Sequence, residues 1–127
     1  MTDAAPNPRL RFHRRSRMRS KNDFTRLFAT ALRARGREFS VAITPNGLGY
    51  TRLGLSVGKR CWRGAVGRNR VRRVFREAFR LSLPDLPVGY DVLMIATQPR
   101  LVPRLEAVRN DLVRLTHEAV ARGAGKR

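Results

Sequence analysis

The residues whose types and spacing most clearly indicate a binding function lie in one arginine-rich run, from Gly67 to Arg80. Placed on a helix at about 100° per residue, the run separates into an apolar stripe and a polar stripe. The apolar stripe consists of Val71, Val74, Phe75, Ala78 and Phe79. The polar stripe consists of Asn69, Arg72, Arg73, Arg76 and Arg80, with Arg70 and Glu77 behind it. Because a solvated helix face gains from neighbouring charges of opposite sign, this one-sided face predicts a polyanionic partner. The alternative is a basic face that only keeps the protein soluble.

The composition of the whole chain favours the same partner. Lysine and arginine number 28 against 9 acids, which gives a formal net charge of +19 at pH 7. Nearly all of this charge is guanidinium, which pairs with phosphate and stacks on bases. An anionic membrane is the alternative partner, but the sequence has no long apolar run, signal peptide or lipidation motif. The sequence therefore predicts binding to nucleic acid, with no membrane and no small-molecule substrate.

The remaining reactive residues do not suggest a catalytic site in the protein. A protein nuclease would need clustered carboxylates that hold Mg²⁺, or a histidine acid–base pair. The spacing of the acids suggests neither, and His13 and His117 are far apart without metal-ligand spacing. The single cysteine, Cys61, excludes an internal disulfide and a cysteine-cluster zinc site. We therefore predict no catalytic residue and no metal site in the protein, and a cytoplasmic location by default.

The helices and strands that must position the arginine run can be predicted from the apolar periodicity and from the positions of proline and glycine. A helix is expected from Ser20 to about Leu32, then strands at residues 39–44 and 52–57 around a turn at Pro45-Asn46-Gly47. The arginine helix should run from about Ala65 to Ser82. A central strand at residues 90–96 and a helix beginning near Pro103 complete the order α-β-β-α-β-α. The fold class is thus α/β (α+β), a two-layer α-β sandwich. We expect a basic arm over residues 1–19, one domain over residues 20–121 and a basic tail over residues 122–127.

The two strands before the arginine helix predict unlike faces for the sheet. Alternation places one set of side chains in the core: Phe39, Val41, Ile43, Leu53, Leu55 and Val57. The other face carries Ser40, Ala42, Arg52, Gly54 and Ser56. These residues are too small and polar to form a second core, so the pattern predicts room for something to lie on the sheet.

Three segments resemble the protein subunit of bacterial ribonuclease P, and the resemblance extends from about Arg17 to Val120. The most specific is Arg68-Asn69-Arg70 followed by Val71-Arg72-Arg73, which matches the family's Arg-Asn-Arg signature. The second is the strand and basic loop from Leu53 to Arg60. The third is Lys21-Asn22-Asp23-Phe24, with Phe28 one turn later, which is similar to the family's opening helix.

The resemblance implies a function that composition alone does not. In the family the RNA subunit is the catalyst and binds most of the Mg²⁺, while the protein helps it remove the 5′ leader from precursor tRNA. A left-handed βαβ crossover is also implied, against the usual right-handed rule. The implied partners are ribonuclease P RNA and precursor tRNA. The implied RNA-binding residues are Lys59, Arg60, Arg68, Asn69, Arg70, Arg72, Arg73, Arg76 and Arg80. The implied leader-binding cleft contains Phe24, Phe28 and Ser56, with Ser40 and Ala42 where many relatives have larger side chains.

Several residues admit two interpretations. Phe24 and Phe28 suit a core as well as stacking on unpaired leader bases. Trp62 suits either a base contact or a cap on the core, and Asn69 suits a helix start as well as RNA or a metal-bound water. Two other function classes, a ribosomal-type RNA-binding protein and a protein-only nuclease, fit the sequence less well than a ribonucleoprotein subunit.

Overall fold

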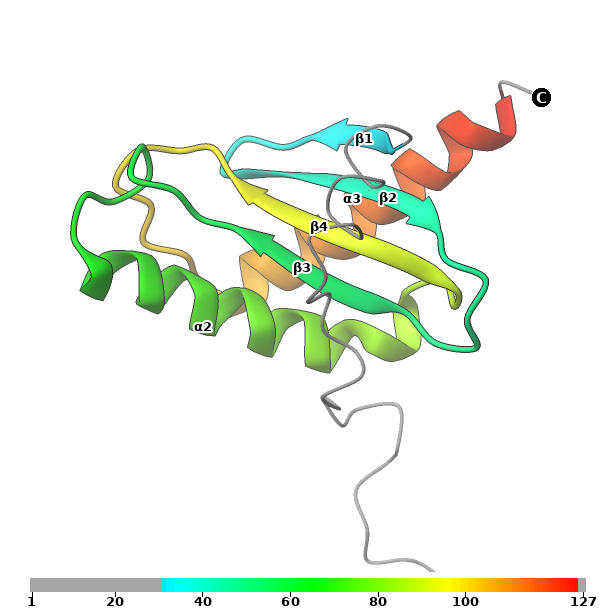
Figure 1. The fold of residues 1–127 in the computed structure, drawn as a ribbon, viewed down its shortest axis with the longest axis horizontal. Coiled ribbons are helices and arrows are strands. Elements are labelled where there is room, and N and C mark those ends of the chain that lie inside the picture. Colours follow the sequence, from blue (N-terminus) through cyan, green and yellow to red (C-terminus); the bar gives the residue numbers. More distant parts are fainter. Residues whose placement is uncertain (1–30, 126–127) are drawn as a thin grey trace, which may run out of the picture.

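A computed structural model describes residues 31–125 as a sheet with helices packed on it (Figure 1). The elements are β1 (Leu32–Arg35), β2 (Phe39–Pro45), β3 (Arg52–Ser56), α2 (Ala65–Ser82), the short 3-10 helix η3 (Leu83–Asp85), β4 (Tyr90–Ala96) and α3 (Leu105–Gly125). The expected bounds of the arginine helix and of the central strand are confirmed. The last helix begins two residues after Pro103 and continues past residue 121, where we expected the domain to end.

The strands form one four-stranded sheet in the order β1-β2-β4-β3. β2 pairs antiparallel with both β1 and β4, whereas β3 pairs parallel with β4. The segment β3-α2-β4 is therefore a βαβ unit between adjacent parallel strands, and it is the crossover for which the resemblance implies a left-handed path. This mixed two-layer arrangement confirms the predicted α/β sandwich.

Strand β1 was not predicted, and it corrects the expected end of the first helix. We expected that helix to reach about Leu32, but Leu32 begins a strand that pairs with Ile43 of β2. The sequence Leu-Arg-Ala-Arg alternates apolar and polar residues, which suits an edge strand. Gly36 makes the tight turn into β2, since a Cβ there would lie 2.5 Å from the carbonyl oxygen of Phe39. The rest of the expected helix, including Phe24 and Phe28, lies outside the described residues.

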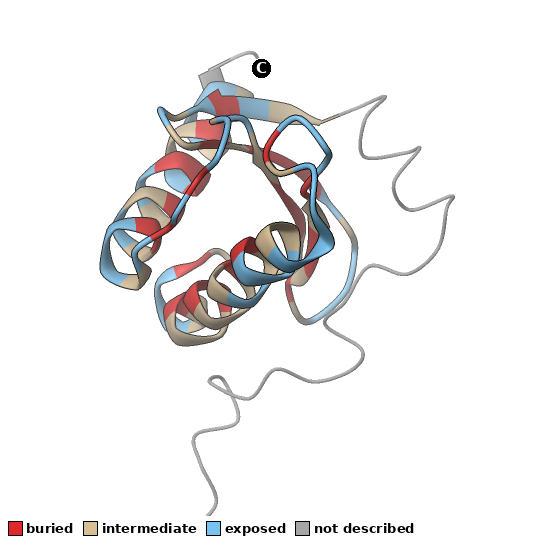
Figure 2. Ribbon diagram, turned by 90° about the vertical axis from the view of Figure 1, so that its left-hand side faces the viewer, coloured by how far each residue is buried: buried red, intermediate tan, exposed pale blue. Residues whose placement is uncertain are grey.

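The core lies between the sheet and the helices α2 and α3, as Figure 2 shows from the end of the sandwich. The predicted core is confirmed: Phe39, Val41, Ile43, Leu53 and Val57 are buried, and Leu55 is partly buried against them. Phe75 of α2 meets Phe39 with ring centroids 5.2 Å apart. The apolar stripe of the arginine helix thus faces the sheet, which turns the arginines outward.

The opposite face of the sheet is less polar than we expected. Ala42 and Leu93 are fully buried there, and Ala31 and Ile95 pack against them in a second small cluster. The reason is β4, a central strand that is apolar on both faces and brings Leu93 beside both Ala42 and Gly54. The expectation that this face is too small and polar for a second core is therefore wrong at its centre, and room for a ligand there stays a prediction.

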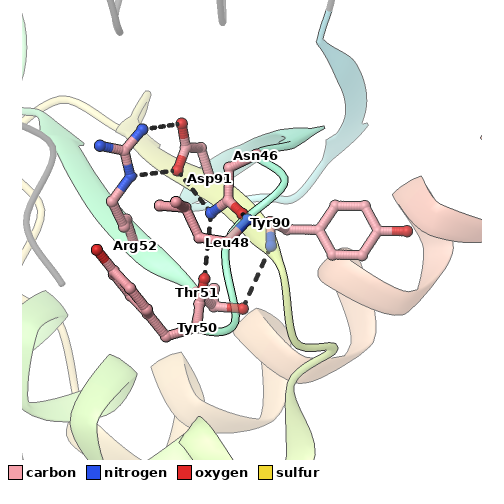
Figure 3. A network of polar contacts seen from close by, with 7 residues as sticks. All are labelled: Asn46, Leu48, Tyr50, Thr51, Arg52, Tyr90 and Asp91. Carbon is pink, nitrogen blue, oxygen red and sulfur yellow. Dashed lines mark hydrogen bonds and ion pairs between the residues drawn. The ribbon is translucent and has the colours of Figure 1, made fainter.

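A buried polar network fixes one end of this second face (Figure 3). Asp91 of β4 is fully buried and forms a bidentate pair with Arg52 of β3, with Nε–Oδ1 and Nη2–Oδ2 distances of 2.7 Å. Asn46 donates from Nδ2 to Asp91 Oδ1 at 3.0 Å and to the Tyr50 carbonyl at 3.2 Å. Gly47 next to it has φ of 71°, which glycine adopts without strain. The predicted turn between β2 and β3 is therefore confirmed and is tied to the sheet by this network.

Candidate nucleic-acid interface

The outer side of α2 carries arginines that have no partner among the described residues. Arg70 and Arg73 are exposed, and neither side chain forms a hydrogen bond or ion pair within residues 31–125. Asn69 is exposed beside them. Two such guanidinium groups, each with its donors directed to solvent, suit contact with phosphates.

The remaining arginines of the signature also hold the protein together. Arg68 donates from Nη1 to the carbonyl oxygens of Trp62 and Arg63, at 3.0 and 2.6 Å. Arg72 donates to Asn69 Oδ1 at 2.9 Å and to the Val57 carbonyl at 3.3 Å. These two arginines thus join the helix to the loop that follows β3.

The structure also narrows the two interpretations of Asn69. Gly64 is the N-cap of α2, and no side chain caps the helix there. Asn69 is therefore not a helix-start residue; its Oδ1 accepts the hydrogen bond from Arg72. A role toward RNA stays a prediction.

At the far end of α2, Arg80 is already neutralised in part. It pairs with Glu77 at 2.7 Å, and Arg76 nearby is half-buried. The hydrogen bond from Arg80 lowers the pKa of Glu77, and the same bond raises the pKa of Arg80. Both groups therefore stay ionised at neutral pH, and Arg80 offers less charge to a partner than Arg70 or Arg73.

Helix α3 differs from α2 in that its exposed arginines are paired with acids, as is usual on a solvated helix face. Its arginines pair with acids three or four residues away: Arg109 with Glu106, Arg114 with Asp111 and Glu118, and Arg122 with Glu118. By contrast, α2 carries six arginines and one acid. The two helices pack side by side on the same sheet face, so the difference lies in the charge pattern and not in the fold.

The basic loop before α2, residues 58–64, forms a compact turn. The amides of Cys61 and Trp62 donate to the Gly58 carbonyl, at 3.0 and 3.4 Å. Cys61 is only 2% exposed and belongs to the core, which leaves Lys59, Arg60 and Arg63 exposed around it. The predicted RNA-binding residues of the loop and of α2 are thus neighbours in space.

Trp62 caps the core and is partly buried there. Its Nε1 donates to the Leu101 carbonyl at 2.7 Å, and its ring packs against the core. Gly67 of α2 lies against the ring, because a Cβ on Gly67 would come within 2.5 Å of Trp62 Cγ. The interpretation of Trp62 as a cap on the core is therefore confirmed, while a contact with RNA stays a prediction.

Gly67→Ala is expected to destabilise the protein although alanine is the better helix former. The gain in helix propensity is about 1 kcal/mol, whereas overpacking a filled site costs about 1–3 kcal/mol. We expect a net loss of up to about 2 kcal/mol in the free energy of unfolding, with a shifted Trp62 emission, measured by denaturant titration. Gly58→Ala, in the loop before α2, is the control, since a Cβ there meets nothing within 4 Å. Stabilisation by Gly67→Ala would contradict this packing.

The predicted cleft residues separate into three groups. Ser40 and Ser56 are half-buried and lie on either side of Ile95, so the sheet does bring them together. Ala42 is buried one row away. Phe24 and Phe28 lie outside the described residues, which leaves the cleft itself a prediction.

Two cations at this face were not predicted from the sequence. Arg33 pairs in register with Ala42, and Arg35 with Ser40, so both belong to the same face as the serines, and both are exposed. The alternation in Leu32-Arg33-Ala34-Arg35 was the signal, but the expected helix obscured it.

Two further findings concern the part of the chain that the structure describes. Over residues 31–125, no three acidic, histidine or cysteine side chains come together as metal ligands. Within the same range, no helix has the length and apolarity to cross a membrane.

The two-layer sandwich and its one-sided arginine surface together define a small α/β protein suited to contact a polyanion. Comparison with known proteins identifies the family. The family model described as Ribonuclease P matches residues 12–120. The chain therefore belongs to the family of ribonuclease P protein components, as the motifs in its sequence predicted.

Individual relatives agree with this assignment. The ribonuclease P protein component of Syntrophobacter fumaroxidans is 38% identical over 89 residues, which cover 70% of this chain and 74% of that protein. That of Marinobacter nauticus is 38% identical over 106 residues, which cover 83% of this chain and 75% of that protein. Among solved structures, the ribonuclease P protein from Thermotoga maritima matches with a TM-score of 0.70 and 29% identity, over 80% of this chain and 96% of that chain. Family membership implies a subunit role in tRNA processing and association with ribonuclease P RNA.

Proposed function

We propose that this protein binds the catalytic RNA of ribonuclease P through the outer side of α2 and the basic loop before it. The observation that carries the proposal is the contrast between the two helices. The arginines of α3 are paired with acids, whereas Arg70 and Arg73 of α2 have no partner within the described residues. Unpaired like charges on one face repel each other, and a phosphate backbone relieves that repulsion.

In this proposal the RNA carries the cleavage and binds most of the Mg²⁺ that it requires. The protein contributes no catalytic group. Its arginines neutralise phosphates, which lets the RNA fold and the substrate approach at lower Mg²⁺ than the RNA alone needs. The reaction is the endonucleolytic removal of the 5′ leader from precursor tRNA, and we propose the cytoplasm as its location.

The leader of precursor tRNA is proposed to lie along the second face of the sheet, beside the apolar centre. Ser40 and Ser56 offer hydroxyl groups there, and Arg33 and Arg35 supply charge from β1. Phe24 and Phe28 would add stacking if the first helix lies where the resemblance implies. The combination of small polar groups and a cationic edge suits a single strand whose sequence varies.

The isolated protein is expected to have no nuclease activity, whereas protein and ribonuclease P RNA together cut precursor tRNA at low Mg²⁺. The reason is that the RNA supplies the catalytic centre and the protein supplies positive charge. The measurement is single-turnover cleavage of 5′-labelled precursor tRNA by protein, by RNA and by both. The protein must be purified under denaturing conditions, which removes host RNA. Metal-dependent cleavage by RNA-free protein would contradict the proposal.

A further inference from the structure

A hollow of about 950 Å³ opens beside the start of α2, on a part of the surface that the signature residues do not line. Its walls come from the basic loop and from one residue of the connection between β4 and α3: Lys59, Arg60, Cys61, Trp62, Arg63, Gly64 and Arg100. No acid is among them. The volume is near the upper end for sites that hold small molecules, so it exceeds what a lone phosphate would fill.

Arg100 joins the hollow from a distant part of the sequence, and its position is specified by several contacts. Its guanidinium carbon lies 5.7 Å from the centroid of the Trp62 ring, within the range of a cation–π interaction. Its amide donates to the Cys61 carbonyl at 2.6 Å. Trp62 is itself held by Leu101 and by Gly67. These contacts fix the position of the ring, and the ring in turn fixes the guanidinium group that lies over it.

The backbone of Arg100 is the second unusual feature. Its φ of 55° is the only positive φ at a non-glycine residue among residues 31–125. Such a conformation is unfavourable for a side chain with a Cβ and persists where the surroundings impose it. Here it places a cation over Trp62, in the hollow that Lys59, Arg60 and Arg63 also line. Those three are exposed, and within the described residues none of the four cations forms an ion pair.

We propose that this hollow binds one nucleotide of an RNA strand, with Arg100 as a phosphate-binding residue and Trp62 as the residue that positions it. The four cations would hold the phosphates at the rim, and the base would occupy the remaining volume next to Trp62 and Arg100. The proposal rests on the proposed function, since the strand belongs either to ribonuclease P RNA or to precursor tRNA. It adds a contact from the β4–α3 connection to an interface otherwise built from α2 and its loop.

Trp62 is the only tryptophan in the chain, so its fluorescence reports on the hollow directly. The full-length protein is titrated with ribonuclease P RNA, and the holoenzyme is then titrated with precursor and with mature tRNA. A change of emission with the RNA subunit identifies that RNA as the occupant. A change only with precursor tRNA identifies the leader. No change in any titration, while binding persists, overturns the proposal.

Arg100→Gln removes the charge, and Arg104→Gln is the matched control, because Arg104 is an exposed arginine outside the hollow. In a plot of log K against log[salt] for the identified RNA, Arg100→Gln should lower the slope by about one and suppress the emission change. Arg104→Gln should leave both nearly unchanged. Equal effects of the two variants would show a long-range charge effect and overturn the proposal. If the wild-type protein binds neither RNA, both the proposed function and this inference are wrong. If variants of α2 weaken binding while Arg100→Gln does not, only this inference is wrong.

Trp62→Phe tests the positioning role, because it keeps a ring and removes the Nε1–H that binds the Leu101 carbonyl. If Trp62 acts through Arg100, Trp62→Phe should lower the salt slope, and the double variant should bind no worse than Arg100→Gln alone. A loss of stability alone would not reproduce this non-additivity. Additive effects of the two substitutions would overturn the assignment of Trp62.

Discussion

Asp91→Asn is expected to cost about 3–5 kcal/mol in the free energy of unfolding, the largest stability effect that we predict for a polar side chain here. The carboxylate is fully buried, binds Arg52 at two points and accepts a hydrogen bond from Asn46. The amide keeps the shape of the side chain but removes the negative charge that faces the Arg52 guanidinium, which is 15% exposed. Denaturant titration of both proteins measures the difference.

Glu118→Gln provides the matched control, since it makes the same chemical change in two exposed ion pairs on α3, with Arg114 and Arg122. Exposed ion pairs contribute about 0–1 kcal/mol, so this variant should unfold almost as the wild type does. A double-mutant cycle with Arg52→Gln then isolates the coupling between Arg52 and Asp91. A cost below about 1 kcal/mol for Asp91→Asn would show that the network adds little to stability.

The double variant Arg70→Gln/Arg73→Gln should weaken binding to ribonuclease P RNA and leave the fold intact. Both side chains are exposed, and neither has a partner within residues 31–125. Each phosphate contact contributes a slope of about −0.7 to −0.9 in log K against log[salt]. Removing both contacts should therefore lower the magnitude of the slope by about 1.4–1.8. Stability should stay within about 0.5 kcal/mol of the wild type, as for surface substitutions elsewhere.

The control for this prediction is Arg109→Gln/Arg114→Gln, which removes the same charge from α3. Those arginines pair with Glu106, Asp111 and Glu118 on a solvated face. The salt slope should therefore change little. A similar loss of slope in both double variants would mean that net charge, and not the face of α2, determines binding. An unchanged slope in the α2 variant would place the RNA interface elsewhere.

The elements of the fold were largely predictable because their signals are local. The apolar stripe from Val71 to Phe79 repeats every three to four residues, and the strand at residues 39–45 alternates every two, so each predicts its own geometry. The breaks at Gly47 and Pro84 fall where the chain turns. Strand β1 was missed because four residues carry a weak pattern, and only pairing with β2 makes them a strand.

The sequence by itself predicted the class of partner, since a net charge of +19 with few lysines favours a polyanion, and Arg68-Asn69-Arg70 indicates the protein family. Tertiary structure alone decided which arginines are free to bind. Arg68 and Arg72 are partly used to hold the loop, whereas Arg70 and Arg73 face outward. The tertiary structure also placed Arg100 over the ring of Trp62. The Trp62 indole donates a hydrogen bond to the carbonyl of Leu101, which is 39 residues away in the sequence. Periodicity describes neighbours along a helix or a strand, but a contact between distant loops depends on how the whole sheet and its helices pack, and no local pattern records it.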